Sequence, residues 1–183
     1  MKSLEQIARE IENCSECKKG KSGLAVPGEG NPKAGIMLIG EAPGKKESET
    51  GRPFVGRAGK FLDKVLAGSG IERKSVFITS PVKYFPGNRA PDEGEINHGR
   101  THLMEQIEAV SPELVVLMGR VAMATIFPDG DISVTRDHGK IIRKDGRDYV
   151  VTVHPSAAMR FNRMRAIITE DFGKLKKLAG RIE

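Results

Sequence analysis

The chain has 183 residues and a net charge of +6, which favours a polyanionic partner such as nucleic acid, although many basic proteins bind none. Its 38% hydrophobic content suffices for one core, and no shift in composition marks a boundary, so we expect a single domain over residues 1–183. No apolar run approaches the ~20 residues of a membrane span, and the first residues lack a signal-peptide core, which predicts a cytoplasmic protein.

The hydrophobic pattern predicts alternating helices and strands. The spacing of Leu4, Ile7, Ala8 and Ile11 predicts an opening helix that ends near Asn13. Continuous apolar or β-branched runs predict buried strands at 36–39, 76–78, 114–117 and 149–153. Helical patterns follow at 58–66, 96–110 and 121–126, and a last helix is expected at about 165–178.

This alternation of strand and helix is typical of an α/β fold. We therefore predict a three-layer αβα sandwich around a central, mostly parallel, four-stranded sheet. Asp145-Gly146 is a hairpin signal, which adds an antiparallel partner to the last strand.

The segment 40–44, Gly-Glu-Ala-Pro-Gly, directly follows the first predicted strand. It is not a P-loop, because three residues rather than four separate its glycines and Lys45 is followed by a second lysine. The dinucleotide fingerprint is absent as well. The segment is a tight turn that presents Glu41 and backbone N–H groups at the edge of the sheet; taken alone, it is equally well a structural turn.

Phe54 and His154 are the other candidate site residues. Phe54 stands in a loop, where its ring can stack on a planar ligand or simply plug the loop to the core. His154 follows the last strand and precedes Pro155, which favours an extended backbone. Its imidazole can donate a hydrogen bond into a pocket, although histidines at strand ends are often purely structural.

Five separated motifs together resemble the family 4 uracil-DNA glycosylases, in that family's order and over most of the chain. They are 28–32 (GEGNP), 40–44 (GEAPG), 51–59 (GRPFVGRAG), 86–89 (PGNR) and 153–157 (VHPSA). The resemblance implies an enzyme that flips uracil out of DNA and hydrolyses its N-glycosidic bond.

The resemblance also implies roles for individual residues. Phe54 would stack on the flipped base, and His154 would hydrogen-bond the uracil oxygen on which negative charge develops. Glu41 would hold the attacking water or stabilise the cationic sugar, and the sequence does not separate these two roles. The backbone of Ala42, Pro43 and Gly44 would close over the base.

The segment after His154 carries candidate DNA contacts. Ser156, Arg160 and Arg163 suit phosphate contacts, and Met159 or Arg160 can wedge into the duplex where the base has left. The plainer interpretation is a solvated helix start. The basic rim of the pocket is extended by Lys45, Lys46, Arg52 and Arg57.

The chain departs from the family at the metal site. Family members mostly bind a four-iron cluster through four cysteines, whereas this chain keeps only Cys14 and Cys17; Tyr84 and Gly99 stand at the other two positions. We therefore expect no four-iron cluster. Cys14 and Cys17 are expected to be free thiols or a local disulfide, with Tyr84 and Phe85 packing in place of the cluster.

Zinc is a further alternative at this place. Cys-x2-Cys followed by His98 and His102 has zinc-like spacing. Because about eighty residues separate the two pairs, we do not expect zinc to bind.

The second departure is Ser80, where the family usually has an asparagine that reads uracil N3–H and O4 together. A serine hydroxyl cannot make both contacts unaided. We expect weaker uracil discrimination, a lower rate, or a shift toward hypoxanthine or xanthine.

The sequence thus predicts a monomeric, cytoplasmic DNA repair hydrolase that acts on uracil or another deaminated base, with no membrane association, no organic cofactor and no obligate protein partner. Three alternatives are weaker. One is a module that only binds uracil-containing or single-stranded DNA. A second is a related subgroup that bonds covalently to uracil-DNA through a histidine in an added basic loop, but no such insertion is present near 86–91. The third is a small-nucleotide hydrolase, against which the missing phosphate loop and carboxylate cluster count.

Overall fold

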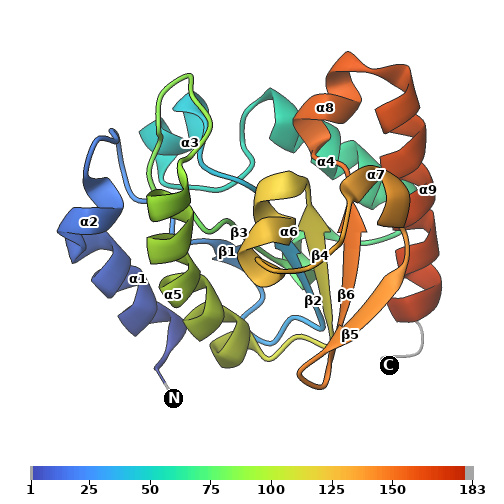
Figure 1. Cartoon of the computed structure of the whole chain (residues 1–183), viewed down its shortest axis with the longest axis horizontal. Coiled ribbons are helices and arrows are strands. Elements are labelled where there is room, and N and C mark those ends of the chain that lie inside the picture. The colour runs from blue at the N-terminus through green and yellow to red at the C-terminus, as the bar shows by residue number, and fades with distance from the viewer. Residues whose placement is uncertain (1, 180–183) are drawn as a thin grey trace.

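The sheet at the centre of the molecule has six strands, and the computed structural model describes residues 2–179 (Figure 1). Their order is β1-β3-β2-β4-β6-β5. The inner four strands are parallel, while β1 and β5 pair antiparallel at the two edges. The strands are β1 Glu29–Gly30, β2 Ile36–Ile39, β3 Phe77–Thr79, β4 Leu114–Met118, β5 Ile141–Lys144 and β6 Arg147–Thr152.

Helices cover both faces of this sheet. They are α1 Leu4–Asn13, α2 Ser15–Lys18, α3 Lys45–Thr50, α4 Arg57–Gly68, α5 Glu93–Val110, α6 Arg120–Ile126, α7 Val134–Asp137, α8 Pro155–Arg160 and α9 Asn162–Ala179, with a 3-10 turn at Arg73–Ser75. Within the described part of the chain, no helix combines the length and the apolar character that crossing a membrane requires.

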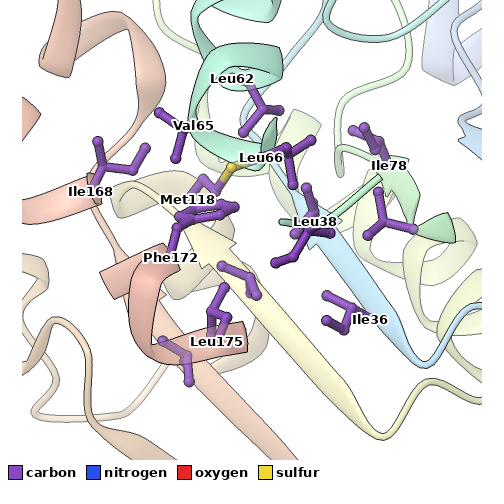
Figure 2. Close-up of a cluster of buried hydrophobic side chains, with 14 of the residues drawn as sticks. Ile36, Leu38, Leu62, Val65, Leu66, Ile78, Met118, Ile168, Phe172 and Leu175 are labelled. Carbon is purple, nitrogen blue, oxygen red and sulfur yellow. The ribbon is translucent and has the colours of Figure 1, made fainter. Parts of the chain in front are cut away.

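The two core clusters follow the pleat of the strands. Ile36 and Leu38 of β2 point to a cluster that contains Leu62 of α4 and Phe172 of α9 (Figure 2). Met37 and Ile39, the alternate residues of the same strand, point to the other cluster, which includes buried side chains of α5 and α6. Because both faces are buried, the strands read as continuous apolar runs, and the predicted three-layer sandwich is confirmed.

The hairpin at Asp145-Gly146 is confirmed, since both residues have positive φ and join β5 to β6. The first helix ends at Asn13 as expected, and the last begins at Asn162, three residues before the predicted start. The edge strand β1 and the short helices α2, α3 and α7 are additions to the predicted set.

Candidate active site

Three parallel strands deliver the predicted site segments to one edge of the sheet. The turn 40–44 follows β2, Ser80 follows β3 and His154 follows shortly after β6. Figure 1 shows the arrowheads of β4 and β6 at this edge, with α8 beyond them. The strand β2 lies between β3 and β4, and the helices that follow β2 and β3 cover opposite faces, so this edge is a topological switch point, where open α/β sheets bind ligands.

A cavity of about 390 Å³ opens at this edge, within the size range of small-molecule sites. It is lined by Val26, Ala42, Pro43, Gly44, Lys45, Lys46, Glu47, Pro53, Phe54, Gly56, Arg57, Ala58, Ser80, His154 and Ser156. All five residues expected to hold the base are in this wall. Of the two expected catalytic residues, His154 lines the cavity, and Glu41 lies beside it as the residue before Ala42.

Phe54 and His154 converge over Gly40. Their ring centroids are 5.8 Å apart, and the ring planes make an angle of 36°. A Cβ atom at position 40 would lie 2.6 Å from Phe54 Cζ and 3.7 Å from His154 Nε2. Only glycine at position 40 leaves both rings in these positions, where Phe54 and His154 line the same cavity.

The Phe54 loop is held in a strained shape by two residues that the sequence analysis did not single out. Phe54 has φ of 50°, a conformation uncommon for residues other than glycine. Glu47 Oε1 accepts hydrogen bonds from the backbone N–H groups of Val55 (2.8 Å) and Gly56 (2.7 Å). The Arg73 guanidinium donates to the carbonyls of Phe54 (3.2 Å) and Pro53 (2.7 Å).

The hydrogen bonds of His154 fix its tautomer. His154 caps α8, and its Nδ1 accepts from the backbone N–H of Ser156 at 3.2 Å, with Ser156 Oγ at 2.7 Å. Burial lowers the pKa of His154 to about 4, so the ring is neutral at pH 7. Because Nδ1 is an acceptor, the single ring proton is on Nε2, the nitrogen that faces Gly40 and Phe54.

Glu41 is partly buried, and its charge has little compensation. Burial raises the pKa of Glu41 above its ordinary value, while the positive charge of Arg120 acts in the opposite direction. A carboxylate that is not fully neutralised by a partner retains its capacity to interact with a cation or a water molecule.

Ser80 is buried, and its hydroxyl donates to the carbonyl of Val82 at 2.8 Å. With the proton used in this way, the oxygen offers the cavity only its lone pairs. In this conformation Ser80 accepts a hydrogen bond from a ligand but donates none.

The predicted DNA contacts lie beside the cavity, on α8 and at the start of α9. Ser156 lines the cavity, Met159 is half-buried, and Arg160 and Arg163 are exposed. Between the two helices stands Phe161, whose exposed fraction of 60% is unusual for a large apolar side chain. The sequence analysis missed Phe161; its position next to Arg160 was the available signal.

A cluster of cysteine and histidine side chains lies away from this cavity, where α1 and α2 meet α5. The ligand atoms of Cys14, Cys17, His98 and His102 all lie within 4.8 Å of one another. Both cysteines are free thiols in the structure. Although about eighty residues separate the cysteines from the histidines in sequence, the fold brings them together in space, because α1 and α2 pack along α5 (Figure 1). The separation in sequence is therefore no reason to exclude zinc.

The fold and the cavity define an α/β protein with a ligand-sized cavity that an aromatic ring and a neutral imidazole both line. Comparison with known proteins agrees, since residues 27–176 match the family model of the uracil DNA glycosylase superfamily. The type-4 uracil-DNA glycosylase of Sulfurisphaera tokodaii is 42% identical over 98% of this chain and 86% of its own length. That of Archaeoglobus fulgidus is 38% identical over 99% and 96%, and that of Thermotoga maritima 36% over 94% and 93%. The chain belongs to the type-4 uracil-DNA glycosylases, as the resemblance of its motifs predicted.

Proposed function

We propose that this protein is a base-excision repair glycosylase that takes uracil out of DNA and hydrolyses its N-glycosidic bond, which leaves an abasic site. The observation that carries the proposal is the pairing of the Phe54 ring with a neutral, tautomer-fixed His154 at one cavity. A base must leave the duplex stack for such a site to reach its glycosidic bond, so the reaction includes base flipping.

In the proposed reaction, the bond between C1′ of the sugar and N1 of uracil breaks, and its electron pair goes to the base. Negative charge then develops on uracil O2, and His154 Nε2–H donates a hydrogen bond to it. Preorganised donors of this kind are worth about 2.7–4 kcal/mol of barrier. The Phe54 ring stacks on the base and holds it in place, and the leaving base finally takes up a proton from water.

The sugar becomes cationic as the base leaves, and water adds at C1′. We propose that the Glu41 carboxylate acts on this side of the bond, either by holding the water or by stabilising the cation. Its incomplete neutralisation by Arg120 supports both roles, because the negative charge stays available to the sugar. No organic cofactor is needed for this hydrolysis.

Ser80 sets the base preference in this proposal. As an acceptor, its oxygen can receive uracil N3–H but can offer no hydrogen to O4. The ring N–H groups of hypoxanthine and xanthine suit the same acceptor, whereas cytosine presents an unprotonated N3. We therefore infer broadened activity toward deaminated bases, with cytosine still excluded.

We further propose that DNA is bound by Ser156, Arg160 and Arg163, together with the basic rim of the cavity, and that Met159, Arg160 or Phe161 fills the gap in the duplex. Their grouping beside the cavity supports this assignment. A single domain that acts as a monomer in the cytoplasm is sufficient for the reaction. The names of the relatives do not favour the alternative of a module that only binds DNA.

The test uses labelled oligonucleotides that carry uracil, hypoxanthine, xanthine, thymine or cytosine, single-stranded and opposite each base, followed by alkaline cleavage at abasic sites. We expect strand breaks with the deaminated bases and none with cytosine, whose unprotonated N3 does not suit the Ser80 acceptor. The variant His154→Gln should lower the rate of uracil excision by about 10²–10³-fold. DNA that is retarded on a gel but stays intact with every base would overturn the proposal.

The variant Ser80→Asn tests the base-reading role. We expect it to raise uracil excision, because the amide can accept from uracil N3–H and donate to O4 together. Each added specific hydrogen bond corresponds to roughly a tenfold change in relative rate. Unchanged rates and unchanged selectivity would place Ser80 outside the base-reading position.

A further inference from the structure

The cluster at Cys14, Cys17, His98 and His102 has the geometry of a closed metal site. Cys14 lies at the junction of α1 and α2, and its Sγ is 3.1 Å from His98 Nε2. His98 and His102 are one helical turn apart on α5, with ring centroids 5.8 Å apart. All four side chains are buried or half-buried, and their ligand atoms lie within 4.8 Å of one another.

The residues of the site do not fit the four-iron cluster of the family. The whole sequence holds two cysteines, and such a cluster is bound by four thiolates. Tyr84, at the third cysteine position, is buried and donates its hydroxyl to the carbonyl of Glu12 at 3.1 Å. A Cβ at Gly99, the fourth position, would lie 2.2 Å from the carbonyl oxygen of Pro81. The cavity between Cys17 and Gly99 is about 10 Å³, room for one water molecule.

We propose that this chain binds a zinc ion through Cys14, Cys17, His98 and His102 in place of the iron cluster. Two thiolates and two imidazoles are a donor set that zinc prefers, in tetrahedral geometry. With metal–ligand bonds of about 2.0–2.3 Å, the ligand atoms of such a site stand roughly 3.3–3.8 Å apart. Side-chain rotations that move each ligand atom by about an ångström or less bring the observed cluster to these distances.

Groups around the four ligands support the site. The backbone N–H of Cys17 donates to Cys14 Sγ at 3.3 Å, which stabilises negative charge on that sulfur. Glu105 Oε2 lies 3.6 Å from His102 Nδ1, and neither atom has a hydrogen-bond partner among residues 2–179. In the site His102 binds zinc through Nε2, and a small closure lets Nδ1–H donate to this carboxylate, the usual arrangement behind a metal-bound histidine.

A competing group of possible ligands, Glu10, His102 and Glu105, is less suited to a metal. Lys2 Nζ lies 2.6 Å from Glu10 and 2.7 Å from Glu105, so a lysine already neutralises these carboxylates. Their carboxylate oxygens are also harder donors than the two cysteine sulfurs, and zinc binds thiolate sulfur and imidazole nitrogen well.

Four protein ligands leave no open position, so the zinc has a structural role. It ties the segment that contains α1 and α2 to α5, across a gap of about eighty residues in the chain. On α5, Gly99 follows His98 directly and lies against Pro81, the neighbour of Ser80. The metal therefore supports the wall of the cavity from outside without touching the substrate.

The experiment starts from the untagged full-length protein, prepared without chelators and measured for metals by mass spectrometry. We expect about one zinc ion per chain and no stoichiometric iron. Replacement by Co²⁺ should give the absorption bands of a tetrahedral thiolate site. Chelation should lower Tm by several degrees, and added Zn²⁺ should restore it.

The variants Cys14→Ser and His98→Asn should lose nearly all bound zinc, whereas His138→Asn, which removes a histidine outside the cluster, should keep it. If a variant fails to fold, the metal content and cobalt spectrum of the unmodified protein still decide. The proposal is overturned if the unmodified protein binds no zinc after equilibration with Zn²⁺, if it holds stoichiometric iron, or if the Cys14→Ser and Cys17→Ser changes together leave zinc binding intact.

Discussion

At the scale of single residues, burial shifts the pKa values of Glu41 and His154 in opposite directions. Burial raises the pKa of Glu41 and lowers that of His154 to about 4. At neutral pH the site therefore holds one carboxylate and one neutral imidazole, which is the protonation state that the proposed reaction uses.

This tuning predicts the pH dependence of uracil excision. As pH falls, Glu41 is protonated first, at a pKa above its ordinary 4.5, while His154 stays neutral down to about pH 4. The rate should decline on the acid side with the pKa of Glu41 and show no inflection near 6.5, the ordinary pKa of histidine. Single-turnover rates against pH check this, and an inflection near 6.5 that is lost in His154→Gln would contradict it.

The raised pKa of Glu41 also predicts an effect on stability. The folded state holds this proton more tightly than the unfolded chain, so stability falls as pH rises through the raised pKa. Glu41→Gln should therefore raise Tm by a few degrees at pH 7 and abolish excision, and the gain should vanish below about pH 4.5.

The matched control is Glu49→Gln on the neighbouring helix α3. The hydrogen bond from Lys46 lowers the pKa of this exposed carboxyl, so its replacement gives no gain in Tm. A lower Tm for Glu41→Gln at pH 7 would show that the fold stabilises the charged form instead.

The motifs made several residues of the cavity predictable. Ser80 and His154 follow parallel strands, whose ends meet at one edge of the sheet, and Phe54 belongs to a loop motif that follows the first of these strands. The sequence could not single out Glu47 and Arg73 in the same way. Glu47 looks like one more acid in a polar helix, and its burial arises only when the Phe54 loop folds over it. Cys14, Cys17, His98 and His102 were considered together as a zinc site, but zinc was not expected because of the distance in sequence, and the fold brings the four side chains together.

At the scale of elements, the loop that carries Phe54 is held by hydrogen bonds with two side chains outside the loop, those of Glu47 and Arg73. A strained residue of this kind costs of order 1–3 kcal/mol and persists only where its surroundings hold it. The backbone contacts of Glu47 and Arg73 provide that support. Gly59 allows the loop to lie on α4, since a Cβ there would come 1.8 Å from the Phe54 carbonyl oxygen.

We predict that Glu47→Ala lowers the rate of uracil excision by about 10²-fold, because the stacking ring loses its position. Glu47→Gln keeps an acceptor for the two N–H groups and should recover most of the rate. Glu47 acts as a positioning residue, so the single-turnover rate should fall more than the affinity for uracil-DNA. Equal losses in both variants, or a loss in affinity alone, would contradict this role.

Two of the elements that the sequence did not predict, β1 and α3, share one cause. The two-residue strand β1 has too few side chains to show a pattern, and it exists because β3 offers an unpaired edge. The helix α3 has the sequence KKESET, with no apolar periodicity, and forms between Gly44 and Gly51 on the wall of the cavity. Long-range contacts, not local propensity, create both elements.

At the scale of the whole molecule, the cavity and the α8–α9 junction lie at the same edge of the sheet, whereas Arg52, expected in the basic rim, pairs with Glu29 outside the cavity. Lys45, Lys46 and Arg57 line the cavity, and Arg160 and Arg163 stand exposed beside it. A net charge of +6 adds a long-range attraction to DNA, and this contribution weakens as salt rises. In the proposed function, the cavity therefore determines specificity, and the basic surface contributes affinity.

The last prediction concerns Phe161, a large apolar side chain that is 60% exposed at the junction of α8 and α9, where we propose that DNA binds. An apolar side chain that enters the duplex as the base leaves replaces the lost stacking, a contribution that single-stranded DNA does not require. Phe161→Ala should therefore lower excision from double-stranded uracil-DNA by roughly tenfold, at about 1–3 kcal/mol per stacked ring, and leave single-stranded excision nearly unchanged.

The matched control is Ile141→Ala, which removes an apolar side chain with 49% exposure on the edge strand β5 and should leave both rates as they are. If the duplex rate falls in Met159→Ala or Arg160→Ala but not in Phe161→Ala, the inserted side chain is one of those two, as the sequence first suggested.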